Sequence, residues 1–133
     1  MAPFRLLHTM LRVRDLDRAL AFYTGALGMR LLRRQDFPEG RFTLAFVGYG
    51  DEASGSVIEL THNWGEHDYT LGTAFGHLAV EVGDVAAAAD LMAARGARLV
   101  RPAGPLRGDP NEWIAFFEDP DGYRIELIER RGR

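Results

Sequence analysis

The stretch VIELT, residues 57–61, is an apolar run with the carboxylate of Glu59 at its centre. Branched and aliphatic residues at this density predict a strand that is at least half buried in a sheet. An ionised carboxylate in such a strand is costly unless a cation lies beside it. A second run of the same kind, RIELI at residues 124–128, carries Glu126. The sequence therefore predicts two equivalent strands, each with a glutamate that faces a cation.

Two histidines occupy comparable apolar strands, His8 in LLHTML at residues 6–11 and His77 in FGHLAV at residues 75–80. His77 follows His8 by 69 residues (8 to 77), and Glu126 follows Glu59 by 67 residues (59 to 126). An ordinary core or surface role is the simpler interpretation of any one of them. That interpretation does not explain why both copies begin with His and end with Glu. The repeat instead predicts a single metal site with two imidazole and two carboxylate ligands.

The hydrophobic pattern predicts the same element order twice, namely strand, helix and three strands. Asp15 and Asp84 are expected to cap the two helices, and Gly28 and Gly96 to end them. The fold class is therefore α+β, with two tandem βαβββ modules and mixed sheets in a single domain over residues 1–133. Module 1 is expected at about 4–61, a polar link at 62–73 and module 2 at about 75–130. The strands are expected at 4–13, 29–34, 42–47, 56–61, 77–82, 98–101, 113–118 and 123–128, with helices at 15–27 and 85–95.

Composition removes several classes of function. The net charge of −3 leaves no basic stripe for phosphates, so no nucleic-acid partner is expected. No apolar run approaches the roughly 20 residues that cross a bilayer, and no signal peptide is evident at the N-terminus, so we expect a cytoplasmic protein without membrane contact. The sequence has no cysteine, so a metal must be held by nitrogen and oxygen.

Two imidazoles and two carboxylates suit a borderline divalent ion such as Ni²⁺, Co²⁺ or Zn²⁺, with Mn²⁺ also possible. Four protein ligands leave room for additional open positions, which a Lewis-acid catalyst needs and a closed structural site lacks. The ligand set therefore favours an enzyme over a metal-stabilised scaffold. His62, His67, Glu66 and Glu81 lack the repeat symmetry and are expected at the surface or in supporting positions, and the aromatic Phe22, Tyr23, Phe46 and Phe116 in the core.

Segments along nearly the whole chain resemble the glyoxalase I family of the vicinal-oxygen-chelate superfamily. The most specific are HTMLRV at residues 8–13 and ELT-x-NWG at 59–65, whereas DPDGY at 119–123 recurs across the superfamily. The resemblance implies a homodimer of paired βαβββ modules whose sheets form an open cup around each metal. The other matching segments are 6–7, 22–23, 27–29, 44–50, 57–58, 76–77, 118 and 125–127.

The resemblance also implies the metal ligands His8, Glu59, His77 and Glu126, with nickel favoured and zinc or cobalt as alternatives. The implied reaction is that of a metal-dependent carbon–sulfur lyase in methylglyoxal detoxification. It converts the hemithioacetal of methylglyoxal and its co-substrate glutathione into S-D-lactoylglutathione through an enediolate. By this analogy Glu126 is the catalytic base, and Glu59 could share that role.

Glutathione carries two carboxylates, so its pocket should offer guanidinium or amide donors. The resemblance assigns the γ-glutamyl carboxylate to Arg12, with Asn63 beside it. Arg101 and Arg107 are candidates for the glycyl carboxylate, although a solvated surface position explains them equally well. The resemblance also places each metal between the first module of one chain and the second module of its partner.

Two alternatives stay open from the sequence. One is another metalloenzyme of the superfamily, either an epimerase or an extradiol dioxygenase that holds iron with two histidines and one glutamate. The other is a non-catalytic module that binds a small molecule without metal. Four intact ligands weaken both alternatives.

Overall fold

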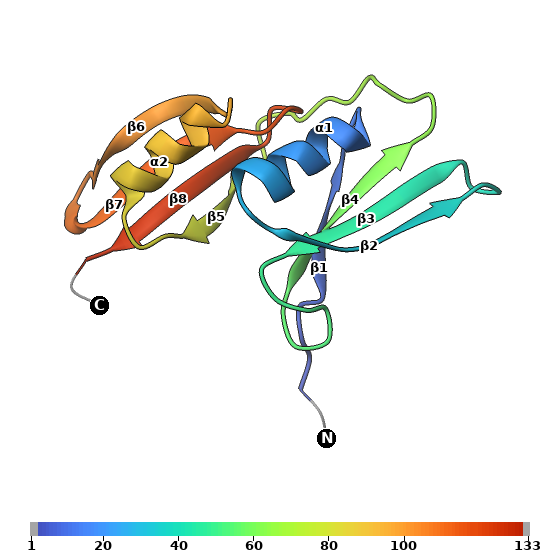
Figure 1. The fold of residues 1–133 in the computed structure, drawn as a ribbon, viewed down its shortest axis with the longest axis horizontal. Helices are drawn as coiled ribbons and strands as arrows, with labels where there is room; N and C mark the ends of the chain where they lie inside the picture. The colour runs from blue at the N-terminus through green and yellow to red at the C-terminus, as the bar shows by residue number, and fades with distance from the viewer. Residues whose placement is uncertain (1–2, 132–133) are drawn as a thin grey trace. The chain divides into compact units, whose positions relative to one another are not determined.

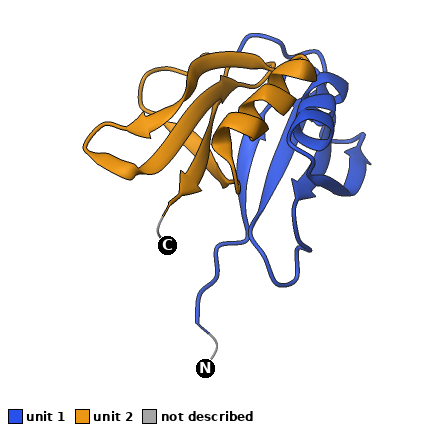
Figure 2. Ribbon diagram, turned by 60° about the vertical axis from the view of Figure 1, so that its left-hand side comes forward, with its two compact units in different colours: residues 1–69 blue, residues 70–133 orange. Residues whose placement is uncertain are grey.

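Two units with the same element order follow one another along the chain, residues 1–69 and residues 70–133 (Figure 2). The computed structural model describes residues 3–131. The expected α+β fold with tandem βαβββ modules and mixed sheets is confirmed (Figure 1). The division at 69/70 falls inside the link expected at 62–73, although His62 and Asn63 still belong to a strand. The elements are β1 His8–Arg12, α1 Leu16–Leu20, η1 Ala21–Ala26, β2 Arg30–Phe37, β3 Phe42–Gly48, β4 Val57–Asn63, β5 His77–Glu81, α2 Val85–Ala94, β6 Arg98–Leu106, β7 Asp109–Glu118 and β8 Arg124–Arg130.

Each unit builds one four-stranded sheet with the same topology, β1-β4-β3-β2 in the first unit and β5-β8-β7-β6 in the second. The first strand of each unit pairs in parallel with the last strand, and the remaining pairs are antiparallel. The strand that carries histidine therefore lies beside the strand that carries glutamate in both units. This adjacency is what positions the candidate ligands.

An aspartate caps the helix of each unit, as the sequence predicts. Asp15 Oδ1 accepts a hydrogen bond from the Arg18 amide at 3.2 Å, and Asp84 Oδ1 accepts one from the Ala87 amide at 3.1 Å. In unit 1 α1 packs against β4, and in unit 2 α2 packs against β6, β7 and β8. The buried core includes Leu11, Leu16, Ala19, Tyr23, Ala45, Val47 and Leu60 in unit 1, and Val85, Ala89, Met92, Ala115, Phe117, Ile125 and Leu127 in unit 2.

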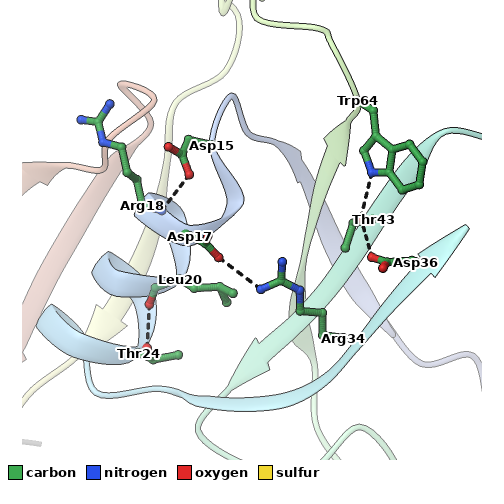
Figure 3. A network of polar contacts seen from close by, with 9 residues as sticks. All are labelled: Asp15, Asp17, Arg18, Leu20, Thr24, Arg34, Asp36, Thr43 and Trp64. Carbon is green, nitrogen blue, oxygen red and sulfur yellow. Dashed lines mark hydrogen bonds and ion pairs between the residues drawn. The ribbon is translucent and has the colours of Figure 1, made fainter. Parts of the chain in front are cut away.

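Several element boundaries differ from the sequence expectations. β1 begins at His8 rather than near Phe4, and β4 extends through Asn63, so His62 lies in a strand rather than in the link. The first helix widens into a π-helix at Ala21–Ala26, where the Leu27 amide donates to the carbonyl of Phe22. The Thr24 hydroxyl also donates to the Leu20 carbonyl at 2.6 Å, in competition with the backbone ladder (Figure 3).

Three strands, β2, β6 and β7, run longer than expected because each continues to its hairpin turn. β2 runs to Phe37, β6 to Leu106, and β7 starts at Asp109. β6 tolerates the prolines at 102 and 105 because it is an edge strand with register shifts. Over residues 3–131, no helix has both the length and the apolar character needed to span a membrane.

Candidate metal centre

The first His–Glu pair forms across the parallel strands β1 and β4. His8 lies opposite Val57 and Met10 lies opposite Glu59, so the imidazole and the carboxylate are diagonal neighbours two residues apart in register. His8 Nε2 is 3.1 Å from Glu59 Oε1. Alternation along β1 directs Leu11 into the core and leaves His8 on the exposed face. The sheet therefore presents this pair on the face away from the helix.

The second pair repeats this geometry in unit 2. His77 lies opposite Arg124 and Ala79 opposite Glu126, again with an offset of two residues. His77 Nε2 is 3.0 Å from Glu126 Oε1. The histidine side chains are 36% and 41% exposed and the glutamate side chains 13% and 12%, which makes the two pairs equivalent in burial as well.

Each of the two pairs has a separation that fits two ligands of a divalent metal ion. Two ligand atoms at right angles on an ion, each with a bond of about 2.1 Å, lie about 3.0 Å apart. Without an ion, the same separation fits a hydrogen bond or an ion pair between the imidazole and the carboxylate. Among residues 3–131, no group of three or more His, Asp or Glu side chains is arranged to hold a metal. Each unit therefore supplies a pair of candidate ligands.

An aromatic ring packs against each histidine. The two rings belong to Phe46 and Phe116, which the sequence predicted only as core residues. Phe46 meets His8 edge to face with ring centroids 5.5 Å apart, and Phe116 meets His77 in the same way at 5.3 Å. Phe46 lies opposite Glu59 in register, and Phe116 lies opposite Glu126. The repeat could have identified both rings, because they are 70 residues apart (46 to 116), close to the offset of the ligands.

An arginine in β2 lies over the ring that packs against His8. The Arg33 guanidinium lies 4.0 Å from the Phe46 ring centroid, and its Nε is 2.8 Å from Glu52 Oε2. The hydrogen bond with Glu52 is the largest cause that raises the pKa of Arg33 above its ordinary value, and the charge of Glu59 adds to this effect. Positive charge therefore lies near the first pair.

The candidate substrate contacts lie on the same strands as the first pair. Arg12 lies opposite Thr61, so Arg12 and Asn63 are diagonal neighbours like His8 and Glu59, four residues further along. The Asn63 amide donates to the hydroxyl of Tyr69 at 3.2 Å. Strand alternation places Arg12 and Asn63 on the face that carries the His–Glu pair.

Arg101, a candidate for the second carboxylate, is engaged by the backbone of its own hairpin. Its guanidinium donates to the carbonyls of Ile114 at 3.0 Å, Pro105 at 3.1 Å and Gly104 at 3.4 Å. Arg107 lies in the turn between β6 and β7. The Arg101 contacts therefore point to a structural role in unit 2.

A separate cleft of about 690 Å³ lies on the other face of the first sheet. His62 of β4 and Trp64, the residue that follows β4, line it together with Asp15, Leu16 and Asp17 at the start of the helix, so the cleft lies on the helix side of the sheet. Trp64 Nε1 donates to the hydroxyl of Thr43 at 2.9 Å, and that hydroxyl donates to Asp36 at 2.7 Å (Figure 3). His62 Nδ1 is 3.4 Å from the Val13 carbonyl. The cleft contains neither ligand of the first pair.

Comparison with known proteins gives consistent matches over nearly the whole chain. The model of the glyoxalase/bleomycin resistance protein/dioxygenase superfamily matches residues 5–127. A lactoylglutathione lyase of Neisseria meningitidis serogroup A is 58% identical over 127 residues, covering 96% of this chain and 91% of that protein. A probable lactoylglutathione lyase of Vibrio parahaemolyticus is 55% identical, covering 98% of this chain and 94% of that protein.

Solved structures of glyoxalase I are also similar to this chain. The enzyme from Zea mays matches with a TM-score of 0.91 and 44% identity over 96% of this chain, which spans only 45% of the maize chain. The trypanothione-dependent glyoxalase I of Leishmania major matches with a TM-score of 0.84 and 44% identity, covering 96% of this chain and 87% of that one. The sequence and structural comparisons thus point to the same group of proteins.

Proposed function

The chain belongs to the glyoxalase/bleomycin resistance protein/dioxygenase superfamily, and we propose that within it the chain is a lactoylglutathione lyase. It isomerises the hemithioacetal of methylglyoxal and glutathione to S-D-lactoylglutathione. The observation that carries this proposal is the duplicated His–Glu pair, with Nε2–Oε1 distances of 3.1 and 3.0 Å at the same register in both units. Lactoylglutathione lyases at 52–58% identity support the same activity.

In this proposal His8, Glu59, His77 and Glu126 hold one divalent ion, with Ni²⁺ as the preferred metal and Zn²⁺ or Co²⁺ as alternatives. When bound, such an ion stabilises negative charge that develops on a substrate oxygen. Neutral imidazoles and ionised carboxylates are the protonation states that this ligand set needs. The mostly buried glutamates and the half-exposed histidines leave the imidazole edges accessible from the open face of each sheet.

The protein's own contribution to the chemistry is proton transfer. The Glu126 carboxylate takes the proton from the carbon that bears sulfur and hydroxyl, and the C–H electron pair moves toward the neighbouring carbonyl to give an enediolate. The same carboxyl group then returns the proton to that neighbouring carbon. The hydroxyl proton of the carbon attached to sulfur passes to the oxygen of the neighbouring carbon, so the first carbon becomes the thioester carbonyl and the second carries the hydroxyl of the lactoyl group. With only 12% of its side chain exposed, Glu126 can carry the proton between the two carbons without losing it to solvent.

Arg12 and Asn63 bind the γ-glutamyl end of glutathione in this proposal. A guanidinium and an amide on adjacent strands offer several parallel donors to one carboxylate. They lie four residues further along the same two strands than His8 and Glu59, in the same diagonal arrangement. Binding of the peptide there would leave its sulfur directed along the strands toward the His–Glu pair.

A metal held by four ligands needs both types of unit, and the proposal includes a homodimer with sites at the subunit interface. Each ion is then held by the first module of one chain and the second module of its partner. A mixture of His8→Ala and His77→Ala chains tests this arrangement, because a heterodimer would keep one intact site. We expect each variant alone to be inactive and the mixture to recover about a quarter of the parent activity. No recovery after subunit exchange would place each site within a single chain.

The cytoplasmic location expected from the sequence remains part of the proposal.

The decisive experiment removes the metal and restores one ion at a time. The chelator-treated protein should form no thioester from methylglyoxal and glutathione, and Ni²⁺ should restore turnover more effectively than Zn²⁺. If no divalent ion supports thioester formation although the protein binds the thiol adduct, the chain is a binding module. The same assay with trypanothione in place of glutathione tests the choice of thiol.

A further inference from the structure

Equivalent arginines lie beside the two phenylalanines but make different contacts. Arg33 lies opposite Phe46 between β2 and β3, and Arg101 lies opposite Phe116 between β6 and β7. A register shift comes just before each arginine, at Leu31/Arg33 and at Leu99/Arg101. The duplicated backbone therefore places an arginine at the same register position in both units.

In unit 1 the guanidinium lies over the aromatic ring that contacts the histidine. Its centre is 4.0 Å from the Phe46 centroid, well inside the range of about 6 Å for a cation–π contact. Glu52 holds the guanidinium there through a contact of 2.8 Å. Phe46 is 4% exposed and meets the His8 ring at an interplanar angle of 78°. A continuous chain of contacts thus runs from Glu52 through Arg33 and Phe46 to His8.

In unit 2 the corresponding guanidinium turns to the backbone. Arg101 donates to the carbonyls of Gly104, Pro105 and Ile114 within its own hairpin. Phe116 keeps its edge-to-face contact with His77, and it is only partly buried. The histidine of unit 2 therefore rests on an aromatic ring that its own arginine does not brace.

We propose that Arg33 is a positioning residue that fixes the His8 imidazole for metal binding and makes the unit 1 pair the more rigid half of the site. Supports behind a metal-bound histidine set the orientation of its ring and thereby the affinity of the site. A rigid His8–Glu59 pair retains the ion, and the less supported His77–Glu126 pair leaves its carboxylate free to move. This inference rests on the proposed function, because it assigns different tasks to the two pairs of that site.

The test measures metal affinity directly, by titration of Co²⁺ against a competing chelator with the d–d spectrum as the readout. Arg33→Leu should weaken Co²⁺ binding by about 3- to 10-fold, which lies between the effect of an exposed cation–π contact and that of a direct support. Arg33→Lys keeps the charge but lacks the planar stack, and should recover only part of the affinity. The d–d bands of Arg33→Leu should also broaden, because the His8 ligand is less fixed.

The matched control is Arg34→Leu, which removes the same charge one residue away. Arg34 pairs with Asp17 at 3.2 Å on the helix side of the sheet, and Asp17 is 84% exposed (Figure 3). We expect this variant to bind Co²⁺ within about twofold of the parent protein. If Arg34→Leu weakens binding as much as Arg33→Leu, or if Arg33→Leu binds as tightly as the parent, the inference is wrong.

Glu52→Gln provides a second test that keeps the size of every side chain. It releases the guanidinium without removing it and should weaken Co²⁺ binding in the same direction by a smaller factor. An unchanged affinity in Glu52→Gln, together with a loss of folding in Arg33→Leu, would overturn the proposed support. If the parent binds Co²⁺ but forms no thioester, the proposed function fails, while the affinity ratio still tests Arg33.

Discussion

The two units repeat the His–Glu pair and the phenylalanine beside each histidine, but not the contacts of the nearby arginine. His8–Glu59 and His77–Glu126 share strand order, register, distance and burial. The equivalent arginines Arg33 and Arg101 make different contacts. Arg33 stacks on Phe46, whereas Arg101 binds backbone carbonyls. The same backbone register thus accompanies the same His–Glu geometry in both units, while the side chains behind the pair differ.

The residues further along the strands have diverged in charge. Arg12 of unit 1 corresponds to Glu81 of unit 2, because each lies four residues after its histidine. His62 and Glu129 also correspond, each three residues after its glutamate. Glu129 accepts a hydrogen bond from the Val85 amide at 2.8 Å, whereas His62 approaches the Val13 carbonyl. Beyond the His–Glu pair, the two units therefore carry chemically different side chains at equivalent positions.

The largest expected effect separates the two glutamates. Glu126→Gln should lower kcat by about 10²- to 10⁴-fold, because an amide cannot take a proton from the substrate carbon. Glu59→Gln should chiefly weaken metal binding, with a smaller loss of kcat once the metal is saturating. Steady-state kinetics at increasing Ni²⁺ concentrations measures both values. Equal losses of kcat at saturating metal would mean that the two carboxylates share the proton transfer.

A second prediction asks whether the two cores contribute equally. Leu60 and Leu127 occupy equivalent positions next to the two glutamates and are 0% and 1% exposed. Leu60→Ala and Leu127→Ala should each lower the free energy of unfolding by about 2–5 kcal/mol, because each leaves a cavity between sheet and helix. Urea denaturation followed by circular dichroism measures the change. A loss below about 1 kcal/mol in only one variant would show that the two units are packed to different densities.

The sequence was sufficient to predict the tandem modules because both the alternating patterns and the His and Glu positions recur at nearly fixed offsets. The helix caps at Asp15 and Asp84 were predictable for the same local reason. The ends of β2, β6 and β7 were not, because strand length there depends on pairing with a neighbour rather than on the strand's own residues.

The contacts around the candidate ligands were harder to predict from the sequence than the ligands themselves. A phenylalanine in an apolar strand has the same pattern whether it only fills the core or also contacts a histidine, as Phe46 does. Whether an arginine stacks on a ring or turns to carbonyls depends on the local hairpin, so Arg33 and Arg101 could not be distinguished. His62 was expected in the link because polar residues surround it, and the pairing of β4 with β3 places it in a strand.

The smallest expected effect concerns Glu129, which has no carboxylate counterpart in unit 1. The hydrogen bond from the Val85 amide is the largest cause that holds the pKa of Glu129 below its ordinary value of 4.5, and the contact with Arg131 adds to it, against the opposing charge of Asp84. A lowered pKa in the folded state means that the ionised group stabilises the protein above pH 4.5 and that this contribution is lost as the pH falls through the folded pKa.

Glu129→Gln keeps an acceptor for the Val85 amide and removes only the charge. The variant should therefore melt below the parent at neutral pH, and the difference in Tm should shrink as the pH falls below 4.5. Glu39→Gln, at an exposed position in the β2–β3 turn, is the control for loss of one negative charge. A Tm difference for Glu129→Gln that persists unchanged to acidic pH would show that the charge of Glu129 does not stabilise the start of α2.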